Sequence, residues 1–338
     1  MKFSVFKSSR DVNFDKALII DGDDHFKELL EGYCLEVGFE AADKFNDFES
    51  AWLNMQQTRY DLIILDWSTK GDLLPSAFFN RLKLHPDFKN IAVIVCTGFK
   101  AKGDFRLVHE FPFTWVIEKP FPSALFQETL EEIAAEMEWF KSNKTKLFKL
   151  LREVIDAPEK TEKVLSSFVK SSKFPEKSGL IMGQALYGKG KYDQAELVFK
   201  SLYNLNRKNV TVLNELGKTL TKQKKFEEAY NILKKASSLS PDNMKRLCMM
   251  GEISLKENSM DAATDEFGRA KKIDPFYRRA AEGLKLAETS NEYFAEQDIE
   301  SQSLEFKFAS LMNTIGIAKV RASDLRDGLE HYKSALYF

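Results

Sequence analysis

The sequence predicts an α/β domain built on a parallel sheet, followed by an all-α array of paired helices. Two observations support this prediction. In the first half, short apolar runs rich in Val, Ile and Leu alternate with segments of helical periodicity, which is typical of a parallel sheet covered on both faces. In the second half, Gly183, Gly217 and Gly251 recur every 34 residues. A fixed period of this length is typical of stacked helix pairs.

The first half contains the apolar runs that we expect to be strands. Clear candidates are residues 16–20, 60–65, 91–96 and 115–117, and a weaker one lies near 40–43. Helical spacing predicts helices over 26–37, 48–55 and 75–84, and a long helix from Ser123. Gly38 is a good helix stop, and Pro75 suits a first turn. Phe111-Pro-Phe113 interrupts the helix expected before the last strand.

Polar residues follow these strands at the point where each one ends. Asp21, Asp66, Thr97 and Lys119 all occupy such positions. Ligand sites in open parallel sheets lie at the carboxyl ends of the strands. We therefore expect these four side chains to share one site.

Residues 16–140 resemble the receiver domain of two-component response regulators. The resemblance rests on four motifs in order, Ile-Ile-Asp21, Leu-Asp66-Trp-Ser68, Val-Cys-Thr97-Gly and Glu-Lys119-Pro-Phe. It implies a flavodoxin-like, doubly wound sheet of five parallel strands, and a chain that acts in bacterial two-component signalling.

The same resemblance implies a role for each site residue. Asp66 would accept a phosphoryl group from a histidine kinase or a small phosphodonor. Asp21, Asp66 and the main-chain carbonyl of Ser68 would hold Mg²⁺, a cation that takes oxygen ligands. Thr97 and Lys119 would contact the phosphate. The peptide bond before Pro120 is expected to be cis. A homodimer is a further expectation from this family.

The sequence departs from the family at one important position. Receiver domains usually carry two adjacent acids after the first strand, and here the second is Gly22. Asp23 or Asp24 could supply the missing ligand, or either could cap the helix that follows. Two hypotheses therefore stay open. The chain is either an atypical response regulator phosphorylated on Asp66, or a pseudo-receiver scaffold that works without phosphorylation.

Residues 176–277 resemble tetratricopeptide repeats. Small residues follow the periodic glycines at fixed offsets, as Ala195, Ala229 and Ala263 do, and Pro241 and Pro275 close the later repeats. We expect repeats at 176–209, 210–243 and 244–277 and a partial one at 309–338. Residues 275–288 would form an unpaired helix, and 289–303 a polar loop. No polar capping helix is visible after the last repeat, so we expect a longer chain or a partner that covers this end.

Residues 141–175 would be linker helices or a degenerate repeat, with a break at 156–158. In tetratricopeptide arrays the first helix of each pair lines a concave groove. Mapped by offset, the groove positions are Lys177, Gln184, Tyr187, Asn214, Lys218, Lys222, Lys245, Glu252 and Lys256. This polar, mildly basic set would suit an extended peptide that bears acidic groups. An ordinary solvated surface is the alternative.

Composition limits the other possibilities. The chain has 338 residues and a net charge of −1, so no global field would attract nucleic acid. Its three cysteines form no metal-ligand spacing, and no apolar run is long enough to span a bilayer. We expect a cytoplasmic protein without DNA binding and without enzymatic activity beyond its own phosphorylation.

Overall fold

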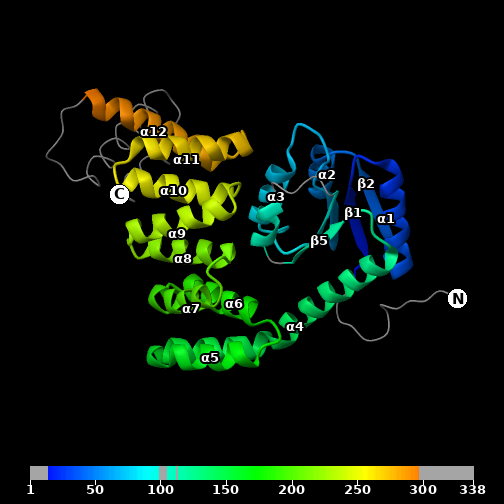
Figure 1. Ribbon diagram of the computed structural model, residues 1–338, viewed down its shortest axis with the longest axis horizontal. Helices are drawn as coiled ribbons and strands as arrows, with labels where there is room; N and C mark the ends of the chain where they lie inside the picture. The colour runs from blue at the N-terminus through cyan, green and yellow to red at the C-terminus, as the bar shows by residue number, and fades with distance from the viewer. Residues whose placement is uncertain (1–13, 99–104, 112, 297–338) are drawn as a thin grey trace. The chain divides into compact units, whose positions relative to one another are not determined.

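The computed structural model describes residues 14–98, 105–111 and 113–296. The chain divides into two compact units. The first comprises residues up to Gln223 together with Lys235–Asn243, and the second comprises Lys224–Lys234 and the residues from Met244 onward. The first unit contains the sheet with its covering helices and the first helix pairs (Figure 1).

Five parallel strands form the sheet. They are β1 (Lys16–Ile20), β2 (Ala41–Phe45), β3 (Leu62–Asp66), β4 (Ala92–Thr97) and β5 (Thr114–Glu118). Their order is β2-β1-β3-β4-β5, and every neighbouring pair is parallel. This is the flavodoxin-like, doubly wound order, so the predicted fold class is confirmed. The central strands β3 and β4 are buried along their whole length, which explains why both read as continuous apolar runs.

Helices cover both faces of the sheet. On one face, α1 (Asp24–Val37) and the first half of α4 (Ser123–Asp156) share a buried cluster with the strands. On the other face lie α2 (Phe48–Met55) and α3 (Pro75–Leu84), whose Phe48 and Phe78 rings are 4.9 Å apart. Figure 1 shows α2 and α3 opposite α1. The sheet is therefore held rigidly between two apolar layers, which fixes the edge where the strands end.

The connection between β4 and β5 departs from this regular alternation. Its described part includes η1 (Phe105–Glu110), a short 3₁₀ helix, within which Leu107 and Val108 are buried. This agrees with the interruption predicted from Phe111-Pro-Phe113. Helices of the 3₁₀ type are short because their hydrogen bonds are poorer than those of an α-helix.

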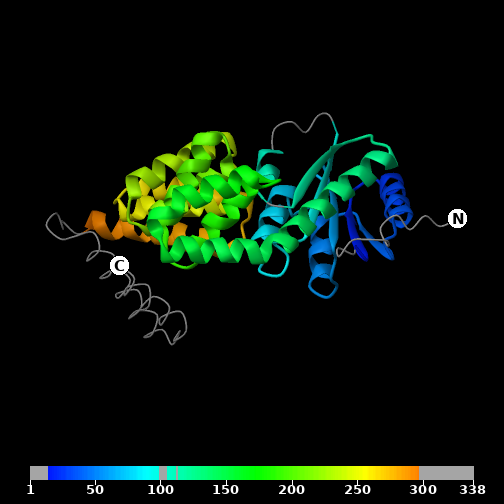
Figure 2. The same cartoon turned by 90° about the horizontal axis from the view of Figure 1, so that it is seen from below.

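The long helix α4 runs without a break from Ser123 to Asp156 (Figure 2). The domain boundary expected at residue 140 therefore lies inside a helix. The predicted break at 156–158 is present, because α4 ends at Asp156 and a 3₁₀ turn, η2 (Pro158–Lys160), follows. After it comes α5 (Thr161–Ser171).

Paired helices make up the rest of the first unit. They are α6 (Pro175–Gly188), α7 (Tyr192–Leu205), α8 (Val210–Lys222) and, in part, α9 (Phe226–Leu239). The periodic glycines have a packing reason. A Cβ added to Gly183 would overlap the ring of Phe199, the bulky residue 16 positions further along the chain. The fixed offset within the repeat is thus a direct contact between the two helices of a pair.

The second unit repeats this contact. It contains α10 (Met244–Lys256), α11 (Met260–Ile273) and α12 (Arg278–Glu296). Phe267 of α11 lies against Gly251 of α10 and Gly283 of α12. Because α12 continues to Glu296, the loop predicted from residue 289 is wrong over 289–296. The partial repeat predicted at 309–338 lies outside the described residues.

Replacing Gly251 with alanine is expected to lower the free energy of unfolding by about 1–3 kcal/mol, as overpacking does. Phe267 cannot move away from the new methyl group, because Gly283 contacts its ring as well. Gly268 of α11 is the matched control, since its Cβ would meet nothing within 4 Å. Gly268→Ala should stabilise the helix by up to about 1 kcal/mol. Urea unfolding followed by circular dichroism measures the free energy of unfolding of both variants. Equal changes in Gly251→Ala and Gly268→Ala would contradict the packing explanation.

Candidate functional site

The carboxyl edge of the sheet brings together residues from four strands. Asp21 follows β1, Asp66 ends β3, Thr97 ends β4 and Lys119 follows β5. Only 2% of Asp21 and 8% of Asp66 is exposed to solvent. Buried carboxylates are costly unless they are paired or hydrogen-bonded, so the contacts of these two residues decide what the site is.

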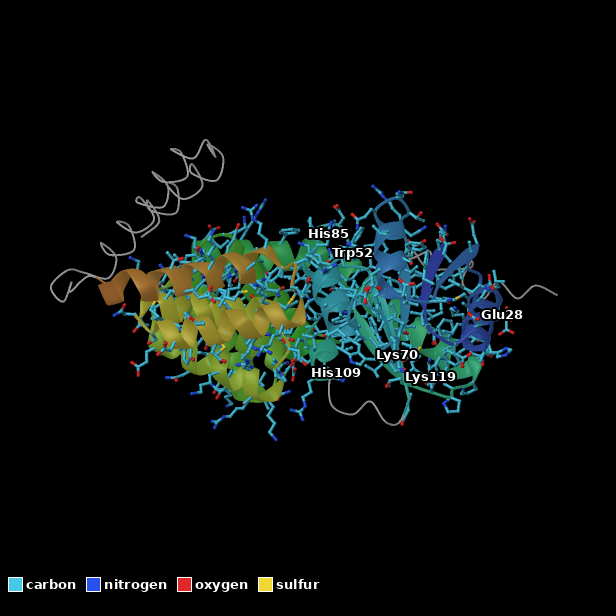
Figure 3. All side chains as sticks on the ribbon, turned by 90° about the horizontal axis from the view of Figure 1, so that it is seen from above. Glu28, Trp52, Lys70, His85, His109 and Lys119 are labelled. Atoms are coloured by element: carbon cyan, nitrogen blue, oxygen red, sulfur yellow. The ribbon has the colours of Figure 1, made fainter. Side chains whose placement is uncertain are left out.

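Lys119 joins the two carboxylates. Its Nζ lies 2.5 Å from Oδ2 of Asp21 and 2.9 Å from Oδ2 of Asp66. Figure 3 labels Lys119 at this part of the α/β domain. Asp21 and Asp66 precede Lys119 by 98 and 53 positions in the sequence, and their carboxylates meet at its ammonium group. The predicted convergence of Asp21, Asp66 and Lys119 is present in the structure.

These contacts also determine the charge of Lys119. Burial acts to lower its pKa, but the hydrogen bonds and charges of Asp21 and Asp66 outweigh burial and raise the pKa above its ordinary value. The ammonium form therefore contributes stability that is fully present below the unfolded-state pKa. That contribution is lost as the pH rises through the raised folded-state pKa.

Phe26 is a site contact that the sequence did not indicate. Its ring centroid lies 4.1 Å from Nζ of Lys119, within range of a cation–π interaction. The ring packs edge-on against Phe121, with centroids 5.6 Å apart. In the sequence, Phe26 was only one of the apolar residues whose helical spacing predicted the first helix. Such spacing does not reveal which polar group an aromatic ring covers.

The loop after β3 holds the carboxylate of Asp66 from its other side. The main-chain N–H of Ser68 donates to Oδ1 at 2.9 Å, and the Ser68 hydroxyl donates to Oδ2 at 2.8 Å. Oδ2 therefore accepts from Ser68 and from Lys119. Together these donors fix the orientation of the carboxylate.

Thr97 lies at the neighbouring strand end and is 7% exposed. Its hydroxyl donates to the carbonyl oxygen of Gly98 at 3.1 Å. Its own carbonyl accepts from the main-chain N–H of Lys119 at 2.7 Å, so the backbones of the two residues are joined. The Lys119–Pro120 peptide bond is cis.

Asp23 is the N-cap of α1. Its carboxylate accepts from the main-chain N–H groups of His25 and Phe26, while its own N–H donates to Oδ1 of Asp21. Of the two roles left open by the sequence, the structure uses Asp23 as the cap. The neighbouring Asp24 forms an ion pair with Lys27.

The donor set at this edge suits Mg²⁺. Asp21 and Asp66 supply two carboxylates, and Mg²⁺ is usually bound by one or two carboxylates together with waters and phosphate oxygens. Across the described residues no group of three or more His, Cys, Asp or Glu side chains could hold a metal ion. Gly22 directly follows Asp21, and a Cβ there would meet nothing within 4 Å.

Comparisons with known proteins address both halves of the chain. Residues 186–246 match the family model for the tetratricopeptide repeat. Among solved structures, the chemotaxis response regulator CheY4 of Vibrio cholerae is 18% identical, with 36% of this chain and 99% of that chain covered and a TM-score of 0.33. The signal receiver domain of a signal transduction histidine kinase from Syntrophus aciditrophicus is 23% identical, with 36% and 91% covered and a TM-score of 0.33.

A tetratricopeptide repeat protein from Parabacteroides merdae is 15% identical, with 59% of this chain and 93% of that chain covered and a TM-score of 0.38. Among curated proteins none matches the sequence significantly. The chain joins an α/β domain with a five-stranded parallel sheet to paired helices, and residues 186–246 of these helices match the tetratricopeptide-repeat model. Arrays of such repeats present extended concave binding surfaces.

Most of the groove positions predicted on these repeats are engaged within the chain. In the first unit, Lys177 bonds to Glu136 of α4, and Asn214 bonds to Glu110 of η1. Further contacts in that unit are Gln184 with Glu215, Lys218 with Glu215, and Lys218 over the ring of Tyr187, whereas Lys222 is exposed. In the second unit, Glu252 forms a two-bond ion pair with Arg279, Lys256 lies over the ring of Phe226, and Lys245 is half-buried.

No helix among the described residues is long and apolar enough to cross a membrane. The described cysteines, Cys34, Cys96 and Cys248, are buried, and burial raises the pKa of each thiol.

Proposed function

We propose that this protein is an atypical response regulator that accepts a phosphoryl group on Asp66 and uses its repeats to bind a protein partner. The observation that carries the proposal is the convergence of Asp21, Asp66 and Lys119 at one edge of the sheet. Transfer of a phosphoryl group to an aspartate requires a nucleophilic carboxylate beside a cation, and Asp66 beside Lys119 meets this requirement.

In the proposed reaction, an oxygen of Asp66 forms a bond to phosphorus, and the bond from phosphorus to the donor breaks. The donor, a histidine kinase or a small acyl phosphate, keeps the electrons of the broken bond. Mg²⁺ held by Asp21 and Asp66 would neutralise the crowded phosphoryl oxygens. Lys119, already 2.9 Å from Asp66, would pair with one of these oxygens.

The residues around the carboxylate have supporting roles in this proposal. Ser68 orients Asp66 through two hydrogen bonds. Ser68 would also offer its main-chain carbonyl to the metal, and Thr97 would hydrogen-bond a phosphoryl oxygen. Asp21 keeps Lys119 beside the nucleophile until the charge of the phosphoryl group arrives.

Incubation with acetyl phosphate and Mg²⁺, followed by intact-mass measurement, tests the proposal. The natural chain is expected to gain the mass of one phosphoryl group, and an Asp66→Asn variant is expected to gain none. Asparagine has the same shape as aspartate but lacks the carboxylate nucleophile. No gain by the natural chain at saturating donor would refute the proposal.

A constitutive scaffold is the second candidate, and two observations favour it. Gly22 stands where the family usually has a second acid, and Lys119 already pairs with both Asp21 and Asp66 without a metal. Trp67, which is 6% exposed and adjacent to Asp66, offers a fluorescence signal that separates the candidates. A saturating response to millimolar or lower Mg²⁺ favours the response regulator, and a flat response favours the scaffold.

A further inference from the structure

Glu110 is a buried acid outside the strand-end site. It is the last residue of η1 and is 4% exposed. Its Oε2 accepts from Nδ2 of Asn214 and from Nδ2 of Asn243, each at 2.7 Å. Its main-chain carbonyl accepts from the hydroxyl of Thr211 at 2.9 Å. All four residues belong to the first unit, so an acid of the receiver-type domain is held by amides of the repeats.

Two neighbouring contacts support this arrangement. The Nδ2 of Asn80 in α3 donates to the carbonyl oxygen of Asp242 at 3.1 Å, and the guanidinium of Arg106 donates to that of Leu239 at 3.4 Å. In both contacts a side chain of the receiver-type domain donates to a main-chain carbonyl. Leu239 is the last residue of α9, and Asp242 follows that helix. Glu110 differs from them, because it is the partner that brings a negative charge.

The chemistry of this contact is specific for an acid. A carboxylate suffers a large desolvation penalty on burial, and hydrogen bonds to an ionised group are stronger than those between neutral groups. Two amide donors on one oxygen therefore favour a carboxylate over a neutral side chain of similar size. We call the pair Asn214 and Asn243 the amide socket.

Asn214 is also one of the positions at which an external acidic peptide was expected to bind. While Glu110 accepts from Asn214 and Asn243, its negative charge repels a second carboxylate from the same two amides. We propose that Glu110 is an internal ligand of the repeats, which fills the amide socket and excludes acidic partner segments until it leaves. The exclusion rests on the proposed binding role of the repeats, but the contact of Glu110 with the socket does not.

Hydrogen exchange on the full chain tests the contact. Glu110→Ala is expected to speed amide exchange in residues 105–110 and 210–222 at least tenfold, because both segments lose a shared buried contact. Glu128→Ala, which removes an exposed glutamate of α4, should leave these rates unchanged. Asn243→Asp sets a second carboxylate against Glu110 and should reproduce the effect without truncating a side chain. Unchanged rates in both Glu110→Ala and Asn243→Asp would overturn the proposal.

Binding of a fluorescent hexaglutamate peptide, measured by anisotropy, tests the competition. Glu110→Ala should bind it at least tenfold more tightly than the natural chain, and adding Asn214→Ala should remove the gain. A hexaglutamine peptide should show no difference between the variants. Equal affinity of the natural chain and Glu110→Ala would overturn the proposal. Because both experiments use protein that has not met a phosphodonor, they are independent of whether Asp66 is phosphorylated.

Discussion

The Gly22→Asp variant is expected to bind Mg²⁺ at least about tenfold more tightly than the natural chain, a difference of about 1.4 kcal/mol. Gly22 directly follows Asp21, and a Cβ there would meet nothing within 4 Å. A side chain can therefore start at this position without its Cβ displacing a neighbour. It would add an oxygen ligand and a negative charge beside Asp21 and Asp66, which Mg²⁺ favours.

Isothermal titration with Mg²⁺ measures this difference, and two variants at the same position serve as controls. Gly22→Ala adds a Cβ without a ligand and should leave the affinity unchanged. Gly22→Asn adds a neutral oxygen ligand and should bind less tightly than Gly22→Asp. An affinity of Gly22→Asp equal to that of Gly22→Ala would mean that the position does not face the metal.

Breaking a buried ion pair lowers the free energy of unfolding by about 3–5 kcal/mol. For the Lys119→Gln variant we expect a loss near the lower limit of this range. The variant leaves the carboxylates of Asp21 and Asp66 without their shared cation. Because 17% of the Lys119 side chain is exposed, water offsets part of the penalty. Mg²⁺ should restore part of the loss, since it can neutralise the same two carboxylates.

Urea unfolding with and without Mg²⁺ measures this effect. Lys70→Gln is the matched control, because Lys70 is an exposed lysine of the same domain (Figure 3). The control should unfold like the natural chain at both metal concentrations. The natural chain should also lose stability as the pH rises through the raised pKa of Lys119, because the ammonium group then loses its proton. The Lys119→Gln variant has no such group and should not show this loss. A Lys119→Gln variant as stable as Lys70→Gln would contradict the bridging role.

Much of the α/β domain could be predicted because its signals are local. The apolar runs of β3 and β4 read as buried strands, and each ends at a polar residue that belongs to the site. Parallel strands end at one edge, so the meeting of Asp21, Asp66 and Lys119 followed from the fold class alone. The glycine period was equally informative, because Gly183 and Gly251 each contact the aromatic residue 16 positions later.

Helix boundaries were harder to predict where composition changed without a true stop signal. The sequence predicted a separate segment from residue 141, but lysine is a good helix former and α4 continues through the lysines after residue 140 to Asp156. In the same way, the polar residues 289–296 extend α12. Polarity alone does not end a helix when no Pro or Gly intervenes.

Contacts of residues outside the strand-end motifs could not be read from the sequence. Phe26 lies over Lys119, and Glu110 bonds to a residue 133 positions away. Helical periodicity identifies an apolar face but not the polar group that the face covers. Asn214 was predicted to meet an acid, but no sequence pattern indicated that an acid of the same chain would occupy it.

Borohydride trapping after reaction with acetyl phosphate and Mg²⁺ tests the central claim most directly. An aspartyl phosphate is a mixed anhydride, and borohydride reduces it to homoserine with release of phosphate. Peptide mass mapping is expected to find homoserine at position 66 in the natural chain, and none at that position in Asp66→Asn. Homoserine at another aspartate, or its absence throughout the chain, would contradict the assignment of Asp66 as the phosphoacceptor.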